Sequence, residues 1–216
     1  MASTETAVRR TDMEQDSAAR AREAIRAGDT ETALRELDGI LAEEKPIHDL
    51  YGDMAASFLT YIADKLGEEA VDESWRHVAD DIWKPVLMHF KETGDLPGLA
   101  QAFVAFLKSH RYDFEVWEDD EKWVFKANYC TSGERMVVEG KVEGQGGDGP
   151  HAFGATKKAY PWSFDTTGLP YYDVHSALWM KLLPAEWGWD VMDCVYQTKG
   201  NGAFAVTEYV LYKAPR

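Results

Sequence analysis

The sequence predicts an α+β protein, with an N-terminal helical assembly packed against a C-terminal antiparallel sheet that is backed by one long helix. Up to about residue 110, apolar residues recur at the helical period. From Arg111 onward, short runs alternate apolar and polar residues between turn residues, as strands do. A hydrophobic content of 45%, with 8 Trp, 9 Phe and 10 Tyr, is sufficient for a packed core.

Composition and charge narrow the functional class. The 216 residues carry a formal charge of −15, which opposes binding to a nucleic-acid backbone. No apolar run approaches the ~18 residues of a membrane span. The N-terminal stretch lacks the apolar segment of a secretory signal, and two cysteines do not make a disulfide framework. We therefore expect a cytoplasmic protein that binds neither nucleic acid nor a membrane and that can be a homo-oligomer.

The chain divides by pattern into three regions. Residues 1–13 are polar and aperiodic, which predicts a disordered tail. Residues 14–110 form the predicted helical domain. Residues 111–216 form the predicted α+β domain, which would carry the ligand or catalytic site.

Five helices are expected in the first half, bounded by capping and breaking residues. Gly28 suits the end of the first helix and Asp95 the start of the last. Pro46 is expected to break the chain between the second and third helices, and Pro85 to kink or end the fourth. The expected spans are 13–27, 30–41, 48–66, 68–89 and 99–107.

The second half begins and ends with a predicted hairpin. The first flanks EDDE (residues 118–121), and the second joins 190–198 to 203–213 across KGNG, a strong turn signal. Between them we expect a short strand at 136–139, a Gly-rich flexible loop over 140–170 and a helix over 172–187.

Well-known catalytic motifs are missing, including Gly-rich phosphate loops, the Gly-x-Ser-x-Gly elbow and His-Glu-x-x-His. Reactive side chains in the second half leave three hypotheses open. In the first, Cys130, His151 and His175 bind a divalent metal such as zinc, with one position open for water. Asp173 is then a fourth ligand, or the acceptor that sets an imidazole tautomer.

In the second hypothesis Cys130 is a nucleophile, His151 or His175 is its base, and Asp173 orients that base. In the third, Cys130 is a small buried residue and the histidines are solvated or hydrogen-bonded. The aromatic residues of the long loop are likewise either core filling or the walls of a pocket for a flat ligand, and the candidates for the pocket are Trp162, Tyr171 and Tyr172.

Three features carry a resemblance to a known family: Cys130 after a strand, the run Gly-Leu-Pro-Tyr-Tyr-Asp-Val-His (168–175) leading into a helix, and Gly-Asn-Gly-Ala-Phe (200–204) at the last turn. Over residues 111–213 the chain resembles the L-2-amino-thiazoline-4-carboxylic acid hydrolase-like proteins. Ser176 and Ala203 stand where such proteins often have Cys. The resemblance implies hydrolysis of a C–N bond in a small cyclic amidine-like substrate, with a divalent metal.

Together these observations predict a small-molecule enzyme, a hydrolase or lyase that acts through Cys130, Asp173 and His175. The alternative is a small-ligand-binding sensor or accessory module with a hydrophobic pocket.

Overall fold

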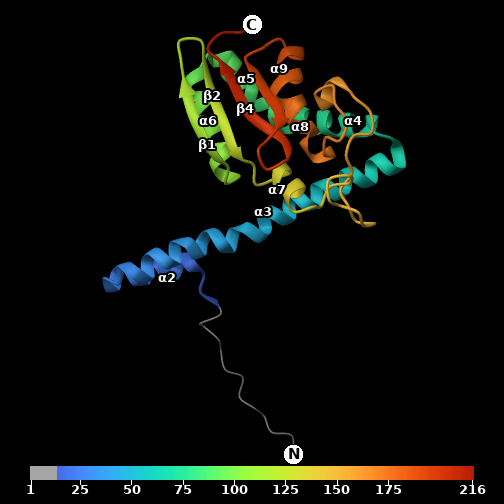
Figure 1. Ribbon diagram of the computed structural model, residues 1–216. Helices are drawn as coiled ribbons and strands as arrows, with labels where there is room; N and C mark the ends of the chain where they lie inside the picture. The colour runs from blue at the N-terminus through green and yellow to red at the C-terminus, as the bar shows by residue number, and fades with distance from the viewer. Residues whose placement is uncertain (1–13) are drawn as a thin grey trace, which may run out of the picture. The chain divides into compact units, whose positions relative to one another are not determined.

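The computed structural model describes residues 14–216 and confirms an α+β fold with one four-stranded antiparallel sheet (Figure 1). The predicted tail, residues 1–13, lies outside the described residues. The chain forms two compact units, the first ending at Leu50 and the second running from Tyr51 to Arg216. The helices between residues 51 and 110 therefore belong to the same unit as the sheet.

The first unit contains α2 (Ser17–Ala27) and the beginning of α3 (Thr30–Leu66). Gly28 caps α2 in the left-handed conformation, with φ of 75°, as its sequence position predicted. Ser17 Oγ donates to Glu43 Oε1 at 2.8 Å across the two helices. A Cβ atom on Gly39 would lie 2.4 Å from Ser17 Oγ, so only glycine allows the helices to approach this closely.

The expected break at Pro46 is wrong, because α3 continues through it and merges the two predicted helices 30–41 and 48–66. Proline lacks the N–H that would bond to the carbonyl of Ala42. Residues 41–47 are exposed, and water can therefore bond to this carbonyl, which makes the interruption tolerable.

In the second unit, helical segments surround the sheet on one side. The predicted helix 68–89 is a run of α4 (Glu69–Val78), a π-helical turn η1 (Ala79–Trp83) and α5 (Lys84–Thr93). The helical run continues through Pro85, in the first turn of α5, and the π-helical turn η1 lies just before this proline, which cannot donate an α-helical hydrogen bond. Asp95 caps α6 (Leu96–Ser109) by accepting a hydrogen bond from Gly98 N at 2.9 Å, as predicted. No helix within residues 14–216 is both long and apolar enough to cross a membrane.

The two predicted hairpins form the sheet, in the order β1-β2-β4-β3. The strands are β1 (Asp113–Glu118), β2 (Lys122–Tyr129), β3 (Met192–Thr198) and β4 (Phe204–Tyr212). Phe125, Tyr209 and Cys194 are register partners and so share one face of the sheet. Phe103 of α6 packs edge-on against Phe125 and Tyr209, with ring centroids 5.0 and 5.2 Å apart. This face of the sheet is therefore the core.

One element prediction in the second half is wrong. Residues 136–139 were expected to form a strand, but α7 (Gly133–Val138) is a helix, held by buried side chains of its first turn. The helix expected over 172–187 forms as an unbroken helical run over 171–186, in four short segments that differ in hydrogen-bond pattern. These are η3 (Tyr171–Asp173), α8 (Val174–Ala177), a π-helical turn η4 (Leu178–Leu182) and α9 (Leu183–Glu186). The π-helical turn lies just before Pro184, which cannot donate the next α-helical hydrogen bond.

The long loop between α7 and η3 is attached to the start of α4 mainly through the carboxylate of Glu68, and Tyr160 Oη also donates to Glu69 Oε1 at 3.2 Å. Glu68 accepts hydrogen bonds from Lys157 N at 2.6 Å, Tyr171 Oη at 2.9 Å and Tyr160 Oη at 3.2 Å. Isolated β-bridges, such as the one between Ala155 and Pro170, connect the two ends of this segment. The Gly-rich segment thus has defined partners.

A buried carboxylate also holds the KGNG turn. The side chain of Glu134 in α7 is fully buried and pairs with Lys199 Nζ at 2.7 Å. Asn201 Nδ2 donates to the same carboxylate at 2.8 Å, and so does Cys130 N at 2.9 Å. Glu134 therefore joins the last hairpin to the end of β2.

Replacement Glu134→Ala should lower the free energy of unfolding by about 3 kcal/mol, because it leaves the ammonium of Lys199 buried without its counter-charge. Urea titration followed by circular dichroism would measure the loss. The control is Glu121→Ala, at an exposed position. Equal stability of the two variants would contradict this account of the turn.

Candidate functional site

His175, in the first turn of α8, is a neutral imidazole with a defined tautomer. Its Nδ1 lies 2.5 Å from the carbonyl oxygen of Tyr172, so Nδ1–H is the donor of that hydrogen bond. Burial lowers the pKa of His175 to about 4, although the Tyr172 carbonyl opposes the shift. Nε2 therefore carries a lone pair at neutral pH. It has no hydrogen-bond partner in the part of the chain that the structure describes.

Three aromatic rings frame this imidazole. The ring centroids of Trp75 and Tyr172 each lie 5.0 Å from that of His175, and the centroid of Trp179 lies at 5.5 Å. Trp75 Nε1 donates to the carbonyl of Tyr171, and Trp179 Nε1 donates to the carbonyl of Trp75. The frame is thus held by hydrogen bonds, while His175 itself stays partly exposed.

Asp173 is a buried carboxyl group two residues before His175. Burial raises its pKa to about 6, and the hydroxyl of Tyr196 opposes this shift by donating to Oδ2 at 2.5 Å. A Cβ atom on Gly133 would lie 1.9 Å from Asp173 Oδ1, so the carboxyl group rests directly on that glycine. Any side chain at position 133 would displace it.

Cys130 lies in the same buried region, at the end of β2. Its Sγ donates to the hydroxyl of Tyr112 at 2.9 Å, and that hydroxyl lies 3.2 Å from the hydroxyl of Tyr209. Burial raises the pKa of the Cys130 thiol, and the charge of Asp173 raises it further. Nucleophilic attack and metal ligation both need the thiolate, which this environment disfavours.

His151 is placed differently from the other candidates. It is exposed and lines a surface hollow of about 340 Å³ that is formed by the Gly-rich loop itself. Among residues 14–216, no three His, Cys, Asp or Glu side chains form a group that could hold a metal ion. The described residues therefore do not bring Cys130, His151 and His175 together as one metal-binding group, and the zinc site stays a prediction.

Of the three aromatic residues predicted to line a pocket, only Tyr172 lies against His175. Trp162 is buried and stacks on Tyr160 at 4.1 Å, and Tyr171 is buried with its hydroxyl on Glu68. Both belong to the packed loop. Neither Trp75 nor Trp179 was among the residues predicted to line the pocket. The four-residue spacing of His175 and Trp179 in a helical segment was a signal for the latter.

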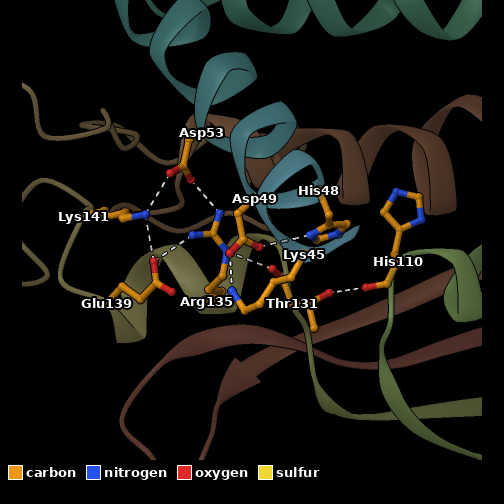
Figure 2. A network of polar contacts seen from close by, with 9 residues as sticks. All are labelled: Lys45, His48, Asp49, Asp53, His110, Thr131, Arg135, Glu139 and Lys141. Carbon is orange, nitrogen blue, oxygen red and sulfur yellow. Dashed lines mark hydrogen bonds and ion pairs between the residues drawn. The ribbon is translucent and has the colours of Figure 1, made fainter. Parts of the chain in front are cut away.

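A charged network holds the segment that contains Gly133. Figure 2 shows the guanidinium of Arg135 between Asp53 of α3 and Glu139, with N–O distances of 2.6 and 2.7 Å. Lys141 pairs with the same two carboxylates, each at 2.8 Å. Thr131 donates to the carbonyl of His110 nearby. These charges alternate in sign and are all paired. The network therefore positions the α7 segment whose Gly133 contacts Asp173, and it does not supply a reactive group.

No protein-family model matches the sequence, and no curated protein or solved structure is detectably similar to it. The resemblance of residues 111–213 to the thiazoline-carboxylate hydrolase-like proteins stays a prediction.

Replacement Asp173→Asn should stabilise the protein at pH 7 by about 3 kcal/mol relative to the wild type. The pKa of Asp173 is about 6 in the folded protein and 3.8 in the unfolded chain. A difference of one pKa unit between the two states changes the free energy of unfolding by about 1.4 kcal/mol. The wild type therefore loses stability as the pH rises from about 4 through 6, and the difference from the variant vanishes near pH 4. Urea unfolding across this range measures it. Asp120→Asn, at an exposed position, is the control, and a pH-independent difference would refute the assignment.

Cys130 and Cys194 should both resist a thiol-specific chromogenic disulfide reagent in the native protein, because both thiols are buried and burial raises both pKa values. Both should react once the protein is unfolded in urea. A cysteine introduced at the exposed Thr93 serves as the reactive control. Rapid native labelling of Cys130, located by peptide mass mapping, would instead favour the nucleophile hypothesis.

Proposed function

We propose that this protein is a small-molecule enzyme, a hydrolase or lyase, in which His175 is the general base. The proposal rests on the protonation state and the hydrogen bonding of the His175 imidazole. It is neutral and partly exposed, its Nδ1–H is engaged by the Tyr172 carbonyl, and its Nε2 is free to accept a proton. This is the arrangement that a proton acceptor needs.

One contact of His175 favours the charged form that appears during proton transfer, although burial opposes it. When Nε2 takes a proton, the Nδ1–H bond to the Tyr172 carbonyl becomes charge-assisted and therefore stronger. This hydrogen bond offsets part of the cost that burial places on the charged ring.

The substrate class follows from the resemblance of residues 111–213 and is consistent with the aromatic frame. A flat cyclic amidine would rest against these rings. His175 Nε2 would take a proton from water as its oxygen bonds to the amidine carbon. This proton would pass to the ring nitrogen, and the remaining O–H proton of the adduct would follow it as the C–N bond breaks and the carbonyl forms, so that both protons of one water end on the departing amine and the ring opens.

Asp173 and Cys130 have supporting parts in this proposal. Asp173 is held by Tyr196 and Gly133 immediately before α8, and so it positions the turn that presents His175. Cys130 acts as a protonated hydrogen-bond donor to Tyr112 beneath the site. No step requires its thiolate.

The aromatic frame favours one alternative, a small-ligand-binding module. Three rings around a free hydrogen-bond acceptor would hold a flat ligand that carries an N–H donor, without any reaction. Turnover distinguishes the two functions.

Replacement His175→Asn should reduce kcat by about 100-fold or more, since it keeps a donor for the Tyr172 carbonyl but removes the base. The assay incubates the full chain with 2-amino-thiazoline-4-carboxylate and follows, by mass spectrometry, the product that gains one water. His77→Asn is the matched control, because His77 is an exposed histidine on α4.

Two outcomes would overturn the proposal. Turnover that survives His175→Asn unchanged would remove His175 as the base. Calorimetric binding of the thiazoline to the wild type without any product would replace the enzyme by the binding module.

A further inference from the structure

The strand β1 forms one edge of the sheet, and its outer side is exposed. In the order β1-β2-β4-β3 it has a sheet neighbour on one side only among the residues that the structure describes (Figure 1). Val116 and Trp117 of this strand are 47% and 62% exposed. An edge strand presents unpaired backbone N–H and C=O groups, and these can pair with another extended chain.

The hydrogen bonds of the first hairpin determine which backbone groups of β1 point outward. Asp119 N donates to the carbonyl of Lys122 at 3.0 Å, so these two residues form a hydrogen-bonded pair at the turn. Hydrogen-bonded and non-hydrogen-bonded pairs alternate along two antiparallel strands. Counted from the turn, Val116 and Glu118 belong to pairs of the second kind. Their N–H and C=O groups therefore point toward the free edge.

A groove of about 470 Å³ lies beside this edge, between α6 and the first hairpin. Ala100 and Val104 of α6 line one wall, and Val116 of β1 and Phe125 of β2 line the other. Val116 and Phe125 are register partners, yet Phe125 is 1% exposed and Val116 is 47% exposed. The helix α6 therefore covers β2 and leaves the same face of β1 open. A chain added at a sheet edge gains specificity from pockets for its alternate side chains, and this groove is such a pocket.

The charges along β1 restrict what can occupy the edge. The strand carries Asp113, Glu115 and Glu118 and no basic residue, and the turn that follows adds three more acidic residues. One cation is already bound at this rim, because Lys213 Nζ lies 2.8 Å from Glu118 Oε1 and 4.8 Å from the ring centroid of Trp123. The unequal numbers of charges favour a basic chain. A second copy of β1 would add three acidic residues to the same edge, and like-charge repulsion opposes it.

We infer that β1 binds an extended, basic segment of a partner protein, which adds to the sheet as a fifth strand. Residues directly opposite each other in a sheet direct their side chains to the same face. The partner residue opposite Val116 therefore points into the groove and is aliphatic, and those opposite Glu115 and Glu118 are Lys or Arg. Backbone hydrogen bonds with Val116 and Glu118 supply affinity, and the groove and the charges supply selectivity. The inference does not depend on the chemistry proposed for His175.

Peptide binding to the full chain tests the strand addition. The probe is acetyl-Lys-Thr-Leu-Lys-Val-Lys-amide, which in antiparallel register sets leucine opposite Val116 and a lysine opposite each acidic residue of β1. In a nuclear magnetic resonance titration, the amide signals of Val116 and Glu118 should shift saturably, and these amides should exchange more slowly with solvent. N-methylation of the leucine removes its N–H donor to β1 and should weaken binding by about tenfold or more. N-methylation of the next lysine, whose N–H points away from β1, is the matched control and should have little effect.

A variant of the groove tests the same contact from the side of the protein. Val116→Lys places an ammonium group at the apolar wall and should weaken binding of the unmodified peptide by about tenfold or more. The matched control is Val138→Lys, at a valine of α7 that is 53% exposed and lies outside the groove lining; it should bind as the wild type does. Circular dichroism verifies that both variants fold. No saturable binding at millimolar peptide, equal binding of the two N-methylated peptides, unchanged binding by Val116→Lys, or equal binding of the peptide with glutamate in place of lysine would each overturn the inference.

Discussion

The packing of the Asp173 carboxyl group between Gly133 and Tyr196 is the constraint on which the rest of the site depends. It joins three segments that are far apart in sequence: the start of α7, the last residue before α8, and β3. Because Asp173 immediately precedes α8, its position determines where the turn with His175 lies. The Arg135 network and the Glu134–Lys199 pair both hold α7 in place, and so they stabilise the contact between Gly133 and Asp173.

Burial acts on the two titratable groups of this turn in opposite directions. It lowers the pKa of His175 and raises that of Asp173, so each group is driven toward its neutral form. The imidazole is thereby kept unprotonated at neutral pH, and the carboxyl group keeps a proton to a higher pH than an exposed aspartate would. The same burial keeps Cys130 as a thiol, which disfavours the hypotheses that need its thiolate.

The sequence by itself determined the α+β class, both hairpins and the capped ends of α2 and α6, because alternation, turn residues and caps are local signals. It also named Tyr172, Asp173 and His175, which are neighbours in the chain. Only the tertiary structure decided that 136–139 is helical, that α3 passes through Pro46, and that Trp75 joins Trp179 from 104 positions away. Tautomer, pKa and ring packing arise from burial and from partners distant in sequence, and no local pattern encodes them.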